Sequence, residues 1–119
     1  MQGWGDVMAG PGQGGLSAER ATSIVIEALD PAERSGGVAY LCVTPFAAGR
    51  ELAVPRQPLA IERDCYVAFV DAQPDANWGH PCRYLLIDVR TGEVSSHPRR
   101  FPVFETGDDR WRIVYRPSR

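Results

Sequence analysis

The sequence predicts an α+β domain in which one N-terminal helix packs on a curved antiparallel β-sheet of four to six strands. The first observation is a single stretch with helical periodicity, residues 17–29. The second is a series of short β-rich segments between residues 38 and 115, separated by glycine and proline turns. An amphipathic helix needs one apolar surface to cover, and a sheet supplies that surface.

The composition is that of one globular domain. The chain has 119 residues, of which 44% are hydrophobic and 24% are charged, and this length suffices for one core. Residues 1–15 are expected to be a flexible Gly-rich arm, and residues 16–119 a single α+β domain. The net charge of −2 argues against a nucleic-acid or membrane-surface partner. No apolar run approaches the roughly 20 residues of a membrane span.

The start of the chain bears on its location. It lacks a basic stretch followed by an apolar one, which is the pattern of a signal peptide. We therefore expect a cytoplasmic protein whose three cysteines are reduced, since an odd number cannot pair fully within one chain.

Residues 17–29 are expected to form the helix. Ser17 suits the N-cap, because its hydroxyl accepts from a free backbone N–H. Apolar residues recur at i, i+3, i+4, i+7 and i+8, and so form one stripe. These residues are Ala21, Ile24, Val25, Ala28 and Leu29. Asp30-Pro31 ends the helix, because the residue before a proline avoids the α region.

The first strands are short. Residues 38–43 are a strand candidate that follows a glycine turn at residues 35–37. Residues 51–54 and 59–61 are candidate edge strands, because the prolines around them are tolerated at sheet edges and not in central strands.

Residues 66–71 and 83–89 are the strongest strand candidates. In the first, one face carries Cys65, Val67 and Phe69, and the other face is apolar as well, so this strand is expected to be central. A turn at residues 91–92 leads to a third strand at residues 93–96. Pro98 and Pro102 interrupt the chain after this strand. Residues 111–115 close the chain as a strand, with Trp111, Ile113 and Tyr115 on one face and Arg112 and Val114 on the other.

Two motifs carry a resemblance to a known family. The helix begins Leu16-Ser-Ala-Glu-Arg-Ala21, and a later strand and turn read Tyr84-Leu-Leu-Ile-Asp88 and Thr91-Gly-Glu-Val94. The chain thereby resembles the PepSY family, which has a helix of the type Ser-x-Glu-x-Ala and a strand of the type Tyr-x-x-x-Asp-x-x-Thr-Gly-Glu-Val. The resemblance covers residues 16–96. It implies a helix on an antiparallel sheet and a non-catalytic role, as in protease propeptides and regulators that bind peptidases.

The chain also departs from the family pattern. It has a proline-rich segment at residues 44–64, a long loop at residues 72–81 and no export signal. The resemblance therefore does not specify a protease partner.

The loop before Cys82 is the main candidate for binding. Trp78 is the kind of large amphipathic side chain that anchors interfaces, and Asn77 and His80 add directional polar groups. The alternative is that Trp78 folds back onto the core. The neighbouring strands add Arg83, with Tyr66 and Tyr84 behind it, to the candidate binding residues.

His80 and Cys82 form the alternative, catalytic interpretation. A histidine that lowers the pKa of a nearby thiol activates a nucleophile. Residues two apart rarely reach attack geometry, however, and a small thiol at the start of an apolar strand is ordinary core material. Asp71 and Asp75 are better interpreted as Asx-turn residues that cap the loop than as acid–base groups.

No metal site or cofactor is predicted. A pairing of residues 65–71 with 82–89 separates Cys65 from His80 by most of a strand, and no Cys-x-x-Cys or His-x-x-x-His spacing is present. The sequence thus favours a non-catalytic module that binds a peptide or protein, with regulation of a peptidase or presentation of a peptide to an enzyme as its role. An extended peptide is expected to add as a strand if residues 94–96 or 38–43 form a free sheet edge.

Overall fold

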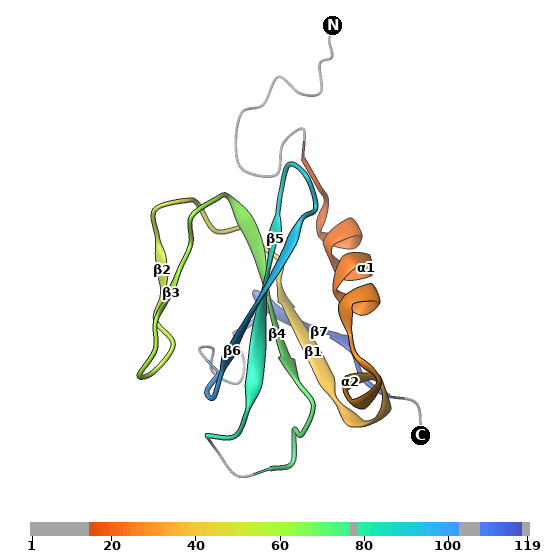
Figure 1. Cartoon of the computed structure of the whole chain (residues 1–119). Helices are drawn as coiled ribbons and strands as arrows, with labels where there is room; N and C mark the ends of the chain where they lie inside the picture. Colours follow the sequence, from red (N-terminus) through yellow and green to blue (C-terminus); the bar gives the residue numbers. More distant parts are fainter. Residues whose placement is uncertain (1–14, 77–78, 103–107, 118–119) are drawn as a thin grey trace, which may run out of the picture.

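The structure, a computed structural model, describes residues 15–76, 79–102 and 108–117 of the chain. It confirms the α+β class and shows three layers, namely two helices, a twisted five-stranded antiparallel sheet and a small hairpin (Figure 1). Apart from Gly15, the predicted Gly-rich arm lies outside the described residues.

The strands of the main sheet lie in the order β6-β5-β4-β1-β7, and each neighbouring pair is antiparallel. Their bounds are β1 (Val38–Cys42), β4 (Cys65–Asp71), β5 (Cys82–Asp88), β6 (Val94–Arg99) and β7 (Trp111–Tyr115). The remaining strands, β2 (Glu51–Leu52) and β3 (Leu59–Ala60), pair only with each other among the described strands.

Helix α1 (Ala18–Ala28) begins and packs as predicted. The N–H of Arg20 donates to the Ser17 hydroxyl at 3.0 Å, which is the N-cap bond. Ala21, Val25 and Leu29 are buried against one face of the sheet. Among the described residues, no helix has both the length and the apolar character needed to cross a membrane.

A second helix, α2 (Pro31–Gly36), was not predicted. α1 ends at Ala28 with Leu29 as its C-cap, just before Asp30-Pro31, and Asp30 is the N-cap of α2, with Pro31 in the first turn. The N–H of Glu33 donates to Asp30 Oδ1 at 2.8 Å, and the N–H of Asp30 donates to Glu33 Oε1 at 2.9 Å. This reciprocal capping box, together with proline at the helix start, explains why a helix begins here.

The central strand is β4, in which all seven residues are buried. Tyr66, Ala68 and Val70 join the core beneath α1, and Val67 and Phe69 join a second core on the opposite face. The prediction that both faces of this strand are apolar and buried is therefore confirmed. A strand with apolar side chains on both faces is stable only where other elements cover each face.

The second core is covered by residues 43–64. Leu52, Val54, Leu59 and Ile61 of this segment are buried against that face of the sheet. The predicted edge strands within it form their own hairpin, β2–β3, instead of joining the main sheet.

The sheet edges differ in part from the prediction. β6 is an edge strand, but it continues past the predicted end at Ser96 to Arg99 and includes Pro98. β1 is an interior strand between β4 and β7. Along β7, a register shift opposite Ala39 and Tyr40 places Trp111 in the second core and Tyr115 against the first, so these residues do not share a face as their spacing predicted.

Candidate binding site

The predicted binding loop is described only in part. Asn77 and Trp78 lie outside the described residues. His80 lies near the end of β4, where its Nε2 is 2.8 Å from both carboxylate oxygens of Asp71. The N–H of Gln73 donates to Asp71 Oδ1 at 2.8 Å, so Asp71 forms the predicted Asx-turn and also holds His80. The contact between Asp71 and His80 thus connects the start of the loop to its end.

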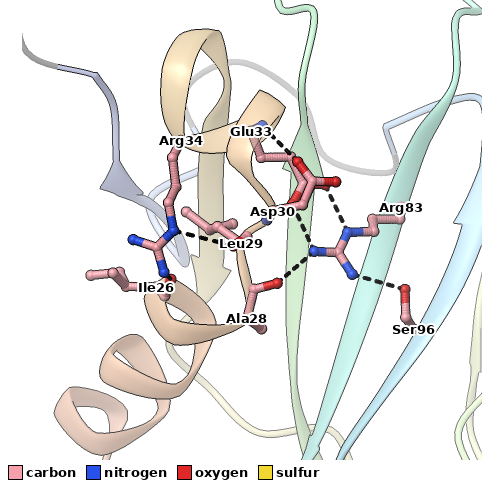
Figure 2. A network of polar contacts seen from close by, with 8 residues as sticks. All are labelled: Ile26, Ala28, Leu29, Asp30, Glu33, Arg34, Arg83 and Ser96. Atoms are coloured by element: carbon pink, nitrogen blue, oxygen red, sulfur yellow. Dashed lines mark hydrogen bonds and ion pairs between the residues drawn. The ribbon is translucent and has the colours of Figure 1, made fainter.

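Arg83 lies at the junction of the two helices with the sheet (Figure 2). Its Nε donates to Glu33 Oε2 at 2.8 Å, and its Nη2 donates to Glu33 Oε1 at 2.7 Å and to the carbonyl of Ala28 at 2.9 Å. Its Nη1 donates to the Ser96 hydroxyl at 3.1 Å. The hydrogen bonds with Glu33 raise the pKa of the guanidinium. These four bonds direct the guanidinium inward, where it connects α1, α2 and β6 through β5.

The two candidate tyrosines are core residues. Tyr66 is 4% exposed and donates its hydroxyl to the carbonyl of Leu16 at 2.9 Å. Tyr84 is fully buried and donates its hydroxyl to the carbonyl of Phe101 at 2.7 Å. Their rings pack on opposite faces of the sheet, so the structure does not bring them together with His80 as one surface.

The surroundings of Cys82 are those of an unreactive thiol. Burial raises its pKa to about 11, the negative charge of Asp71 acts in the same direction, and Arg100 opposes them less strongly. A thiol whose pKa lies that far above neutral pH is almost entirely protonated, whereas the thiolate is the nucleophile. The catalytic interpretation therefore gains no support from this geometry.

Slow thiol labelling of the folded protein is the expected consequence. Burial raises the pKa of Cys65 to about 11 and also raises that of Cys42. We expect iodoacetamide at pH 7.5 to modify the native protein far more slowly than the protein in denaturant, with a rate that rises continuously up to pH 10. Rapid labelling of Cys82 near pH 7, lost in Cys82→Ser, would instead favour the cysteine-dependent enzyme.

A metal site is not formed by these residues. Cys65 pairs with Asp88 and Cys82 pairs with Arg99, which places the two thiols at opposite ends of β5. Within the ranges that the structure describes, no three His, Cys, Asp or Glu side chains are grouped as metal ligands.

The edge strand β6 directs backbone groups away from the sheet. The N–H of Asp88 donates to the carbonyl of Glu93 at 2.9 Å. Antiparallel ladder bonds recur at every second residue, so Val94 and Ser96 direct their N–H and C=O groups away from β5. Pro98 belongs to the same outward series, where its missing N–H costs no ladder bond.

A groove of about 400 Å³, the hairpin groove, lies between the β2–β3 hairpin and the β5–β6 side of the sheet. Its apolar lining is Leu59, Ala60, Cys65, Leu86 and Val94. Its polar lining is Glu62, Arg63, Asp88, Glu93, Ser95 and His97. Arg99 connects β6 to the hairpin by donating to the carbonyls of Gln57 at 2.8 Å and Pro58 at 3.3 Å. The volume is typical of ligand sites, which span roughly 300–1,000 Å³.

The hairpin groove has a negative charge balance. Three carboxylates line it, those of Glu62, Asp88 and Glu93, against one guanidinium, that of Arg63. Arg63 Nη1 lies 3.4 Å from Asp88 Oδ2 and 3.2 Å from Glu93 Oε1. The N–H of Arg90, donating to the Asp88 carboxylate, is the main cause that lowers the pKa of Asp88. Asp88 is therefore ionised at neutral pH.

His97 adds a polar but uncharged group to this groove. Burial lowers its pKa, the charge of Arg99 lowers it further, and Glu62 raises it less. A histidine whose pKa lies below its ordinary value is mostly neutral at pH 7. Its Nε2 lies 2.8 Å from the Ser95 hydroxyl. The histidine therefore leaves the negative charge balance of the groove unchanged.

A second groove of about 370 Å³, the helix groove, lies on the other face of the sheet beside the start of β6. Its apolar lining is Leu16, Ile24, Ala28 and Val94, and its other lining residues are Arg20, Glu27, Thr91 and Gly92. Gly92 has a φ of +79°, and a Cβ there would lie 3.4 Å from Ile24 Cδ1. Val94 lines both grooves, because the edge strand begins between them.

The opposite edge, β7, is protected against strand addition. Arg110, Arg112 and Arg116 are exposed along or beside it, and its pairing with β1 is irregular. Charges and bulges at an edge disfavour pairing with another chain. By contrast, residues 94–98 of β6 carry no charge at neutral pH, and the one edge-protecting feature among them is Pro98, which offers no outward N–H.

The grooves were missed by the sequence analysis, although part of the signal was present. Alternation at Ser95 and His97 predicts one shared face, and Pro98 marks an edge. The hairpin groove also needs β3 beside β5 and β6, and residues 59–60 are far from residues 94–97 in the chain.

Compared with protein-family models, curated proteins and solved structures, the chain matches none of them. The resemblance to the PepSY family stays a prediction from the motif residues alone.

Proposed function

We propose that this domain is a non-catalytic module that binds an extended peptide or protein segment as an added strand on β6. The observation that carries the proposal is an uncharged stretch of edge strand, paired on one side only among the described strands, with a groove on each face. Peptides that add to a sheet edge gain affinity from main-chain hydrogen bonds and specificity from pockets for alternate side chains. Such a module regulates a peptidase or presents a peptide to an enzyme.

The described end of the loop does not border the outer edge of β6. Cys82 pairs with Arg99, so residues 79–81, which precede Cys82, lie at the end of the sheet where β6 finishes. His80 contacts Asp71 of β4, however, and β5 separates β4 from β6. Binding at the β6 edge is therefore proposed independently of His80.

Ser96→Pro is expected to remove binding while the fold is retained. The N–H of Ser96 points away from β5, so proline deletes a donor to the added strand and no bond of the existing ladder. Peptides selected from a displayed random library on the wild type should bind the variant at least tenfold more weakly by fluorescence anisotropy, which corresponds to about 1.4 kcal/mol.

Ser96→Ala is the matched control, because both variants lose the hydroxyl that accepts from Arg83 and only the proline variant loses the N–H. We expect the alanine variant to bind like the wild type. The proposal fails if the selected peptides bind the folded Ser96→Pro protein with unchanged affinity, or if the selection enriches no peptide.

A further inference from the structure

The two grooves beside β6 differ in chemistry. Successive side chains of an extended strand point to opposite faces of the sheet. A strand added to β6 therefore directs every second side chain toward the hairpin groove and the others toward the helix groove. The first groove carries three carboxylates and one guanidinium, and the second has an apolar base formed by Leu16, Ile24 and Val94.

We infer that the segment bound at β6 alternates basic and apolar side chains, with the basic ones in the hairpin groove and the apolar ones in the helix groove. This inference rests on the proposed function and specifies the chemistry of its ligand.

The charge balance of the hairpin groove supports a basic side chain. Arg63 contacts Glu93, and 68% and 72% of these two side chains are exposed, whereas the Asp88 side chain is 12% exposed. An exposed ion pair such as Arg63–Glu93 is weak, because water and salt screen it. An incoming guanidinium or ammonium group is therefore able to share the Glu93 carboxylate, with Glu62 as a further partner and the negative charge of Asp88 nearby. Leu59 and Leu86 offer apolar contact for its aliphatic stem.

The helix groove supports an apolar side chain. Ile24 and Ala28 are only partly buried on α1, although they belong to the apolar stripe of that helix. Gly92 has no side chain to cover them. An apolar side chain from an added strand next to Val94 would remove this surface from water, which is favourable.

The test compares three labelled nine-residue peptides at 0.15 M salt by fluorescence anisotropy. The first alternates arginine and valine, the second has the same composition with arginines and valines in separate blocks, and the third alternates glutamate and valine. We expect the alternating arginine peptide to bind at least tenfold more tightly than either of the others.

A charge reversal tests which groove selects the basic side chain. The double variant Glu62→Lys/Glu93→Lys should bind the arginine peptide at least tenfold more weakly and should prefer the glutamate peptide. The matched control, Glu51→Lys/Asp109→Lys, has the same net charge but changes exposed carboxylates outside both grooves. It should keep the preference of the wild type.

The inference is overturned if the alternating and block peptides bind alike, if both double variants weaken binding equally, or if the alternating arginine peptide does not bind at millimolar concentration. The proposed function has a separate readout. If library-selected peptides of other chemistry bind the wild type and lose affinity in Ser96→Pro, the β6 edge is a binding site and only the inferred chemistry of the ligand is wrong.

Discussion

Replacing Arg83 with methionine is expected to lower the free energy of unfolding by about 3 kcal/mol, which is typical when one partner of a buried ion pair is removed. Glu33 is 6% exposed in its side chain and would be left buried without its bidentate partner. The carbonyl of Ala28 would lose a donor as well. Breaking a buried ion pair usually costs roughly 3–5 kcal/mol. The loss expected here is at the lower end of that range because 22% of the Arg83 side chain is exposed. Urea denaturation followed by circular dichroism measures the change.

A double variant tests whether the unpaired Glu33 carboxylate causes the loss of stability in Arg83→Met. Glutamine at position 33 keeps an acceptor for the N–H of Asp30, so Arg83→Met/Glu33→Gln should recover part of the stability lost by Arg83→Met alone. Arg90→Met is the control at an exposed arginine and should change stability by less than about 0.5 kcal/mol. Equal effects at positions 83 and 90 would show that Arg83 has no role in connecting the helices to the sheet.

Truncating Tyr84 to alanine is expected to cost roughly 3–5 kcal/mol, which is the usual effect of removing a buried aromatic side chain. The ring is fully buried, and its centroid lies 5.2 Å from that of Phe69. Tyr84→Phe keeps the ring and removes only the bond to the carbonyl of Phe101, so it should cost about 1 kcal/mol. The midpoint of urea denaturation measures both changes.

Ile113→Ala provides the comparison for this core position. Ile113 is 41% exposed, and its truncation should therefore cost much less than that of Tyr84. Peptide binding by the folded Tyr84→Phe protein should equal that of the wild type. If Tyr84→Phe lost peptide binding without a change in stability, Tyr84 would be a binding residue, and its assignment as a core residue alone would be wrong.

Several elements were predictable because their signals are local. Periodicity identified α1, and apolar residues on both faces identified β4 as central. The signal for α2 was also present, since Asp30 and Glu33 have the spacing of a capping box and Pro31 suits the first turn. It was missed because Asp30-Pro31 was interpreted only as the end of the preceding helix.

Other features follow from pairing between distant segments. Pro98 continues β6 because the register with Arg83 turns its nitrogen away from the neighbouring strand. Along β7, the register shift opposite Ala39 and Tyr40 changes which residues share a face. Neither register is encoded in the strand itself, so the position of Pro98 predicted the wrong end for β6 and alternation predicted the wrong faces for β7.

The candidate binding residues also show the difference between local sequence signals and contacts formed only in the folded chain. Residue type alone predicted that Arg83 and Tyr84 were available for a ligand, because arginine and tyrosine are common at interfaces. The folded chain places the guanidinium on Glu33, fifty residues away in sequence, and the tyrosine ring in the second core. Local patterns thus sufficed for the fold class and the main elements. The edge strand, the two grooves and the buried ion pair depend on long-range packing, because only folding brings their residues together.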